Sequence, residues 1–328
     1  MMHSPVHKSM RLTSATIIPL LLCACSIPAC LFADGEDVEV AAAAFDGSRA
    51  WHDLEALVDL GPRRIATPQS TATRAYIREQ LEPLGWEFTE LTFTALAPAG
   101  AKRQGEFIGT NLLARRAGTA AGELWLASHY DTFDRPRFIG ANYAGSSTSV
   151  LIELGRQLAG SGPRTGMSVV LCWFDGEEPF YPEPWDDHNN STFGSRWLAE
   201  QKHQDGSIRD IGALILLDMV GDKQLGISIE SMSSGWIRSI FERTANGLGY
   251  KQLFVDRREI KDDHLPFMHK GVPTADLIDF RFGPGNSWWH TNEDTLEKCS
   301  QQSLQTIGTV VMSALPALEK AAIPRLKR

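Results

Sequence analysis

Short apolar runs alternate with apolar positions at helical spacing along most of the chain. The runs, which predict strands, are 86–93, 124–127, 169–174, 213–217 and, more weakly, 272–278. The helical spacings predict helices, which lie at 77–84, 150–158 and 304–318. We expect Gly85 to end the first helix and Pro316 to kink or break the last. Helices that alternate with strands predict an α/β fold.

The first 33 residues have the pattern of an export signal. Lys8 and Arg11 precede an uncharged stretch, 12–33, which is long enough to span a bilayer. Ser, Thr and Pro within that stretch favour a signal over a permanent membrane helix. Cys25 and Cys30 are candidate sites of lipidation. We therefore expect an exported protein that is periplasmic, secreted or lipid-anchored, and any membrane attachment should use this segment.

The rest of the chain divides into an acidic, alanine-rich linker at 34–44 and a single domain at 45–328. Of the 328 residues, 43% are hydrophobic and 22% are charged, which is the profile of a folded globular protein. The formal net charge is -8, so we expect no nucleic-acid partner. Only Cys172 and Cys299 follow residue 33, too few cysteines for a disulfide framework.

Three of the expected strands end in ionisable side chains. The second, third and fourth runs lead to His129, to Glu177 and Glu178, and to Asp218, respectively. Loops are polar, so one such ending is ordinary, but three of them with a Glu-Glu pair and a histidine favour a site. Ligands of open α/β sheets bind at the carboxyl ends of the strands. We therefore expect these four side chains to converge on one cleft.

Two later segments add candidates to this cleft. Asp262 lies in the acidic segment 261–264, and His290 follows two tryptophans. Carboxylates and imidazole suit Zn²⁺, which binds His nitrogen and Asp or Glu oxygen in tetrahedral sites. A turn at Gly176 would let Glu178 bind the metal while Glu177 stands beside it as a proton carrier.

The chain resembles the zinc aminopeptidase-like superfamily, which includes the M28 aminopeptidases and the glutaminyl-peptide cyclotransferases. The motifs that carry the resemblance are His129-Tyr130-Asp131, Gly140-Ala141-Asn142, Phe174-Asp175-Gly176-Glu177-Glu178, Asp262-Asp263-His264-Leu265-Pro266-Phe267 and Trp289-His290-Thr291. The resemblance implies a three-layer αβα fold with a mostly parallel, twisted central sheet. Asp262 before the Asp-His pair and Trp289 before the late histidine favour the cyclotransferase branch.

This branch implies a single Zn²⁺ ion and a set of functional side chains. The resemblance assigns zinc ligation to Glu178 and His290, catalysis to Glu177 with Asp218 and Asp262, and substrate binding to Trp289 and Trp185.

One position departs from the superfamily pattern. Asp follows the Gly-Ala-Asn turn in the family, where it binds metal, but this chain has Tyr143 there. Neutral tyrosine, with an ordinary pKa of about 10, is a poor ligand. A catalytic zinc is expected to have three protein ligands. The ligand set could be completed by an ionised Tyr143, by Asp131, or by a shifted Asp218 with His129.

The sequence thus predicts an enzyme, a zinc-dependent glutaminyl-peptide cyclotransferase that acts on the N-termini of peptides or proteins. It would convert N-terminal glutamine to pyroglutamate and release ammonia, with the metal as a Lewis acid. An M28-type aminopeptidase is the first alternative. It must activate a water between two metals, so it depends on the missing carboxylate more than cyclisation does. The second alternative is a non-catalytic exported binding protein, which Tyr143 supports.

Overall fold

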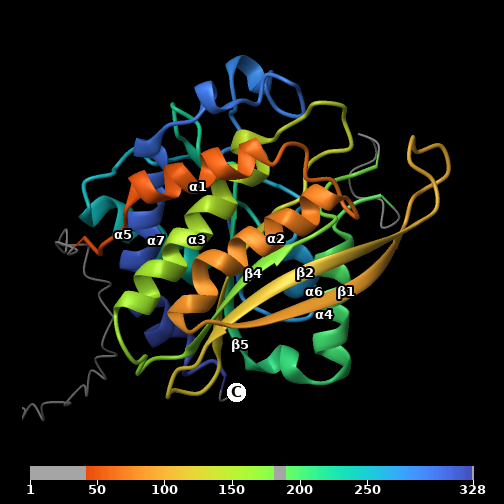
Figure 1. Ribbon diagram of the computed structural model, residues 1–328. Coiled ribbons are helices and arrows are strands. Elements are labelled where there is room, and N and C mark those ends of the chain that lie inside the picture. The colour runs from red at the N-terminus through yellow and green to blue at the C-terminus, as the bar shows by residue number, and fades with distance from the viewer. Residues whose placement is uncertain (1–41, 181–189, 327–328) are drawn as a thin grey trace, which may run out of the picture. The chain divides into compact units, whose positions relative to one another are not determined.

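Eight strands form one mixed sheet in the part of the chain that the computed structural model describes, residues 42–180 and 190–326 (Figure 1). They are β1 (Glu87–Leu96), β2 (Glu106–Arg116), β3 (Glu123–His129), β4 (Ser168–Phe174), β5 (Ile211–Asp218), β6 (Ile227–Glu230), β7 (Phe254–Arg258) and β8 (Thr274–Ile278). Their order across the sheet is β1-β2-β4-β3-β5-β8-β6-β7. The central strands β4, β3, β5 and β8 are parallel, so their carboxyl ends share one edge.

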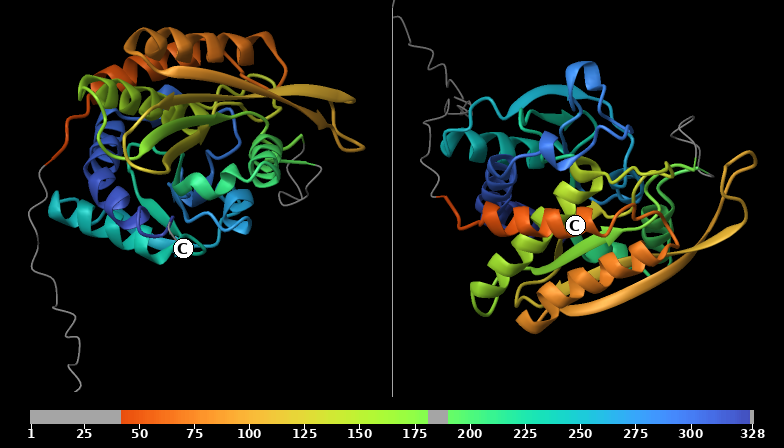
Figure 2. Two further views of the ribbon diagram at one scale, coloured as in Figure 1. Left: turned by 90° about the horizontal axis from the view of Figure 1, so that it is seen from below. Right: turned by 45° about the horizontal axis from the view of Figure 1, so that its top comes forward.

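Helices cover both faces of this sheet (Figure 2). They are α1 (Gly47–Asp59), α2 (Pro68–Leu81), α3 (Ser147–Gly160), α4 (Phe193–Gln204), α5 (Gly235–Gly247), α6 (His264–His269) and α7 (Gln301–Ala322). Side chains of α1, α2, α3, α5 and α7 pack in one apolar cluster with Leu126 and Leu171. Side chains of α4 and α6 pack with Trp125 and Cys172. These two residues are next to Leu126 and Leu171 in their strands, so their side chains point to the opposite face of the sheet. The expected three-layer α/β fold is therefore confirmed.

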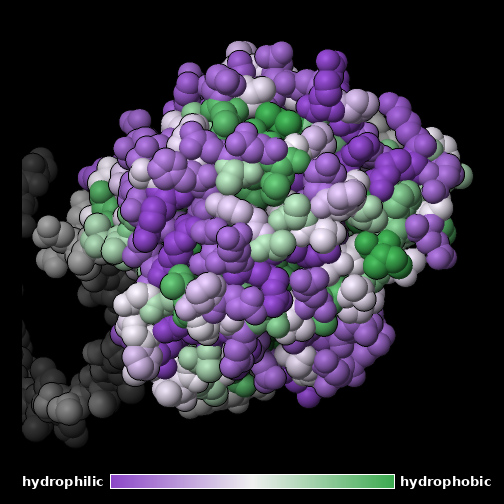
Figure 3. Space-filling view, in the orientation of Figure 1, coloured by the Kyte–Doolittle hydropathy of each residue, from purple (hydrophilic) through white to green (hydrophobic). Residues whose placement is uncertain are grey.

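The strands differ in burial as their sequences imply. Every residue of β4 and β5 is buried, as continuous apolar runs require in a sheet covered on both faces. The edge strand β7 instead exposes charged side chains such as Arg258, which discourage pairing with another chain. The face of the molecule seen in Figure 3 is largely hydrophilic, with small scattered apolar patches.

Two expected helix ends have different outcomes. The helix expected at 77–84 ends as α2 at Leu81, and a 3-10 turn follows before Gly85, whose φ of 82° ends the segment. Of the two outcomes expected at Pro316, a kink or a break, the break is wrong, because α7 continues past the proline to Ala322. Buried side chains on both sides of the proline, including Val311 and Leu318, hold the two halves of the helix against the same core.

The predicted export segment, 1–33, and most of the predicted linker, 34–44, lie outside the described residues. The residues that the structure describes all belong to one compact unit, Asp37–Arg328. No helix among residues 42–180 and 190–326 has both the length and the apolar character of a membrane span.

A buried arginine ties together the loops at the carboxyl edge of the sheet. The Arg63 guanidinium donates to the carbonyl oxygens of Tyr130 (3.2 Å), Ile139 (2.9 Å) and Gly140 (3.0 Å). Burial lowers the pKa of Arg63 to about 10, so the side chain stays charged at neutral pH. Gly140 leads into a π-helical turn, Ala141–Ser146. Arg63 thus fixes this turn relative to the loop that follows β3.

Candidate active site

Side chains from the ends of three central strands meet at the carboxyl edge of the sheet. His129 is the last residue of β3 and Asp218 the last of β5, and His129 Nε2 lies 3.4 Å from Asp218 Oδ1. The other ring nitrogen of His129, Nδ1, lies 3.8 Å from Glu177 Oε2 in the loop after β4. All three side chains are buried. The parallel order of the strands brings these distant residues into contact.

The turn between β4 and the two glutamates requires a glycine. Gly176 has a φ of 68°, and a Cβ at this position would lie 2.9 Å from Ile65 Cδ1. Beyond the turn, the Asp131 carboxylate accepts hydrogen bonds from the backbone N–H groups of Glu177 (3.1 Å) and Glu178 (3.2 Å). Asp131 therefore anchors the glutamate pair, and a role as metal ligand would compete with these two hydrogen bonds.

Asp131→Ala is expected to lower the free energy of unfolding by about 2–6 kcal/mol, because two buried N–H groups would each lose an acceptor at about 1–3 kcal/mol. Urea denaturation followed by tryptophan fluorescence measures this loss. Asp131→Asn keeps one acceptor oxygen and should lose roughly half as much. Equal stability of Asp131→Ala and the wild-type protein would show that these hydrogen bonds do not hold the loop.

Glu178 and His290 approach each other from separate loops. Glu178 Oε2 lies 3.3 Å from His290 Nε2. Two ligands have this separation in a tetrahedral site with bonds of about 2.0–2.1 Å. His290 has a positive φ of 54°, and its ring stacks on Phe133 (centroids 4.6 Å apart) and on Trp289 (4.0 Å). Burial lowers the pKa of His290 to about 3, so its imidazole is neutral.

Tyr143 contacts both imidazoles of the site. Its ring centroid lies 5.2 Å from that of His129 and 4.9 Å from that of His290. The Asp294 carboxylate holds the backbone of the π-helical turn, because it accepts hydrogen bonds from the N–H groups of Asn142 (2.7 Å) and Tyr143 (3.1 Å). Asp294 therefore fixes the backbone that places the tyrosine side chain between the two histidines.

The donor atoms of the site are of types that bind Zn²⁺, but too few of them are arranged as ligands. Both ring nitrogens of His129 and one oxygen of Asp218 have no hydrogen bond of good geometry in the described part of the chain, and a cation would satisfy such atoms. In that same part, no three His, Cys, Asp or Glu side chains are arranged to hold a metal ion. Burial and the nearby Glu178 raise the pKa of Tyr143 well above its ordinary value, so the phenol is neutral. The three-ligand zinc site that the resemblance implies thus lacks its third ligand at position 143.

Two acids of the site, Glu177 and Asp262, are shifted toward their protonated forms. Burial raises the pKa of Glu177 and of Asp262 well above their ordinary values, and neighbouring carboxyls raise both further. Burial alone would lower the pKa of His129, but contacts with Asp131 and Asp218 raise it well above its ordinary value. A carboxyl with a raised pKa can accept a proton and return it, as a general acid–base catalyst must.

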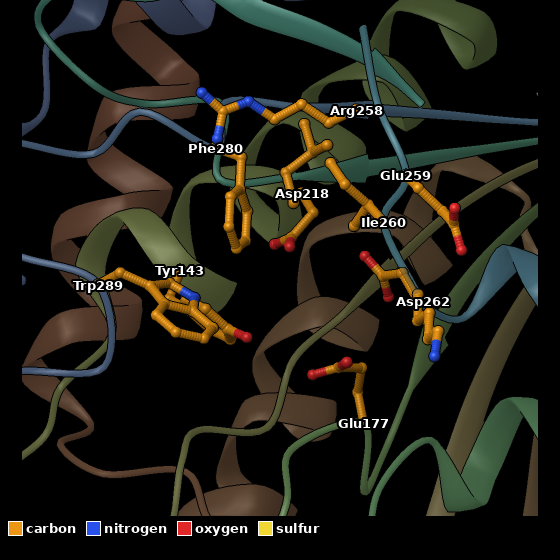
Figure 4. Close-up of a pocket in the computed structure, with 11 residues that line it drawn as sticks. Tyr143, Glu177, Asp218, Arg258, Glu259, Ile260, Asp262, Phe280 and Trp289 are labelled. Carbon is orange, nitrogen blue, oxygen red and sulfur yellow. The ribbon is translucent and has the colours of Figure 1, made fainter. Parts of the chain in front are cut away.

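Three of these side chains, Glu177, Asp218 and Asp262, line a cavity of about 380 Å³ (Figure 4). The carboxyls of Glu177, Asp218 and Asp262 point into it from three sides. Trp289 and Phe280, with ring centroids 5.3 Å apart, form an aromatic wall. The volume is in the range of small-molecule sites. Such a cavity suits a small ligand that presents an amine to the carboxyls and a flat group to the aromatic rings.

The predicted site residues that the structure describes lie together at this edge of the sheet, and they are Glu177, Asp218, Asp262, Trp289, Glu178, His290, His129, Asp131 and Tyr143. Trp185 lies outside the described residues. Sequence patterns missed the contributions of Arg63, Phe133 and Asp294. Asp294 follows the Trp-His-Thr motif closely, which marks its position but not its role as a backbone anchor.

Residues 111–315 match the family described as Peptidase family M28. The chain belongs to peptidase family M28. A glutaminyl-peptide cyclotransferase of Bothrops jararaca is 30% identical to this chain over 305 residues, which cover 80% of this chain and 79% of the relative. The expected membership of the cyclotransferase branch is therefore confirmed.

Solved structures agree with the M28 assignment. A glutaminyl cyclase from an Acidobacteriales bacterium has a TM-score of 0.78 at 32% identity, over 88% of this chain and 99% of that protein. A Zn-dependent exopeptidase from Parabacteroides distasonis, with a TM-score of 0.74 at 23% identity over 85% of this chain and 99% of that one, shares the fold. Zinc dependence is part of the name of that second protein.

Proposed function

We propose that this M28 protein is a glutaminyl-peptide cyclotransferase, which converts the N-terminal glutamine of peptides or proteins to pyroglutamate and releases ammonia. The cavity carries this proposal, because three buried carboxyls face an aromatic wall. N-terminal glutamine would present its α-amine to the carboxyls and its flat carboxamide to the wall. The names of the relatives from Bothrops jararaca and from the Acidobacteriales bacterium support the same activity.

The reaction forms one bond and breaks one. The α-nitrogen attacks the side-chain carboxamide carbon, and the bond from that carbon to its own nitrogen breaks. Glu177 takes the proton that the attacking nitrogen loses and delivers it to the departing nitrogen, which leaves as ammonia. Asp218 and Asp262 hold the α-amine from the other sides of the cavity. Because both reacting groups belong to one residue, the protein has only to fold the side chain back on itself.

A single zinc ion remains part of the proposal, as a prediction from the sequence. Glu178 and His290 would hold it through donor atoms 3.3 Å apart, and it would supply a Lewis acid for the carboxamide oxygen. Residues 42–180 and 190–326 provide no third ligand, so the steps above use only the side chains of the protein.

An aminopeptidase is less well supported. Peptide hydrolysis must activate a water, commonly between two metals about 3.5–4 Å apart. His129 and Asp218 form a second donor pair, with atoms 3.4 Å apart. However, Tyr143 stands at the position of the carboxylate that bridges the two metals in the family pattern. Cyclisation needs no water nucleophile, so it depends less on this bridge.

Ammonia release from three peptides tests the proposal on the purified full chain. A Gln-initiated peptide should release ammonia. The same peptide with an acetylated N-terminus is the matched control and should release none, because it lacks the nucleophile. A Leu-initiated peptide should stay intact. Hydrolysis of the Leu-initiated peptide alone would favour the aminopeptidase, and turnover of no peptide would favour a binding protein.

We also propose that the protein is exported and that its first 33 residues direct this. The basis is the pair Lys8 and Arg11 before the uncharged stretch 12–33. Fractionation of expressing cells should find the protein outside the cytoplasm. Mass spectrometry of its N-terminus would distinguish a cleaved, soluble form from one with lipid at Cys25 or Cys30.

A further inference from the structure

The phenol of Tyr143 points into the same cavity as the three carboxyls. Figure 4 shows its oxygen directed toward the space that Glu177 and Asp218 face. The residue comes from the π-helical turn after β3, whereas those carboxyls come from the ends of β4 and β5. A substrate carbonyl between these groups would therefore have a hydroxyl on one side and proton-carrying carboxyls on the others.

Packing fixes the direction of this hydroxyl. The ring of Tyr143 meets that of His129 edge-on, at an interplanar angle of 80° and a centroid distance of 5.2 Å. His290 lies 4.9 Å away and Phe138 closes a third side at 6.1 Å. Asp294 holds the backbone N–H of Tyr143 at 3.1 Å. The hydroxyl is thus preorganised, as a group must be if it is to stabilise charge that develops during a reaction.

We propose that the Tyr143 hydroxyl donates a hydrogen bond to the γ-carbonyl oxygen of the substrate glutamine and stabilises the negative charge on that oxygen during cyclisation. This inference rests on the proposed function. A phenol with an ordinary pKa of about 10 carries its proton at neutral pH and can donate it in a hydrogen bond. Tyr143 would therefore be a catalytic residue that contacts the reacting atoms.

The step balances without a further reactant. As the α-nitrogen bonds to the carboxamide carbon, an electron pair of the carbonyl moves onto the oxygen, where the Tyr143 hydroxyl stabilises it. The pair returns when the bond to the departing nitrogen breaks, and one proton passes from the attacking nitrogen through Glu177 to ammonia. Tyr143 keeps its own proton throughout.

The position of Tyr143 explains why a hydrogen-bond donor would matter in this chain. The family pattern has a carboxylate there, which would complete a metal site with Glu178 and His290. Tyrosine removes that ligand and adds a donor at the same place. The hydroxyl would act on the carbonyl oxygen, where a metal held by three ligands would otherwise act, so the phenol would offset part of what the missing ligand removes.

Tyr143→Phe tests this role, because it keeps the ring and removes only the oxygen. We expect kcat for a Gln-initiated peptide to fall roughly 100- to 1000-fold with KM little changed, since one donor to a developing oxyanion has about this effect. Bound zinc, measured by mass spectrometry of the metal, should be the same as in the wild-type protein. Tyr76→Phe is the matched control and should keep wild-type turnover, because its hydroxyl donates to Asp53 away from the cavity.

Two results with Tyr143→Phe would overturn the inference. The first is wild-type turnover. The second is loss of bound zinc together with activity, which would make Tyr143 a metal ligand and not a donor to substrate.

Ammonia release by the wild-type protein separates the failure of this inference from the failure of the proposed function. If the wild-type protein releases ammonia and Tyr143→Phe is equally active, only the role of the phenol fails. If the wild-type protein releases none, the proposed function fails, and the inference fails with it. Ammonia release by Tyr143→Asp with added zinc would then show that the fold supports the reaction once a carboxylate stands at position 143.

Discussion

Tyr143→Asp should bind zinc more than about 100-fold more tightly than the wild-type protein, because even residues outside the ligand shell change metal affinity by about 10–100-fold. The substitution supplies a third ligand beside Glu178 and His290, whose donor atoms already lie 3.3 Å apart. Asp294 anchors the backbone at position 143, so the new carboxylate would start from a fixed place. Competition with a zinc-binding dye measures the two affinities.

Tyr143→Asn is the matched control, because it has the size of the aspartate without its charge. In the absence of metal, Tyr143→Asp should melt at a lower temperature than the wild-type protein, since it adds a carboxylate beside the buried Glu177 and Glu178. Added zinc should reverse this loss, because it binds only the folded site. Equal zinc affinity in the Asp and Asn variants would show that other ligands already complete the site.

Glu177→Gln is expected to lower turnover by about 10²–10⁴-fold, the usual contribution of a positioned general acid–base group. Glutamine keeps the shape of the side chain but cannot accept the proton of the attacking nitrogen. The loop should stay in place, because Asp131 holds the backbone N–H at this position and not the side chain. Ammonia release measures the rate, and circular dichroism checks the fold.

Glu200→Gln is the control for this substitution, since Glu200 is a carboxyl on the surface of α4 that accepts a hydrogen bond from Lys270. It should retain wild-type turnover. Full activity in Glu177→Gln would instead assign the proton transfer to another carboxyl of the cavity, of which Asp262 is the candidate.

The core strands and the meeting of their ends could be predicted because both follow from simple patterns. A strand buried on both faces needs an uninterrupted apolar run, as in β4 and β5. Parallel neighbours end at one edge, which brings His129 to Asp218. The strands β2, β6 and β7 were not expected. Most positions of β7 are exposed, so it has no apolar pattern. It is a strand because it pairs with β6.

The anchoring roles of two acids could not be predicted from local sequence. Asp131 binds the N–H of Glu177 across 46 positions of the chain, and Asp294 binds that of Asn142 across 152. Each hydrogen bond joins a carboxylate to a distant loop that only the fold brings near it. No local sequence pattern identifies which loop a given carboxylate will contact. The residues themselves lie in or beside recognisable motifs, so their importance could be suspected while their function could not.

The anchor at Asp294 also bears on how this position can change over time. A turn secured by a distant acid does not depend on the residue that it displays, so its shape can survive an exchange of that residue. Selection can then replace a charged group by an aromatic alcohol, or the reverse, in a single substitution. In this architecture one residue holds the loop and another contacts the ligand, and only the residue that contacts the ligand can be exchanged without loss of the loop's shape.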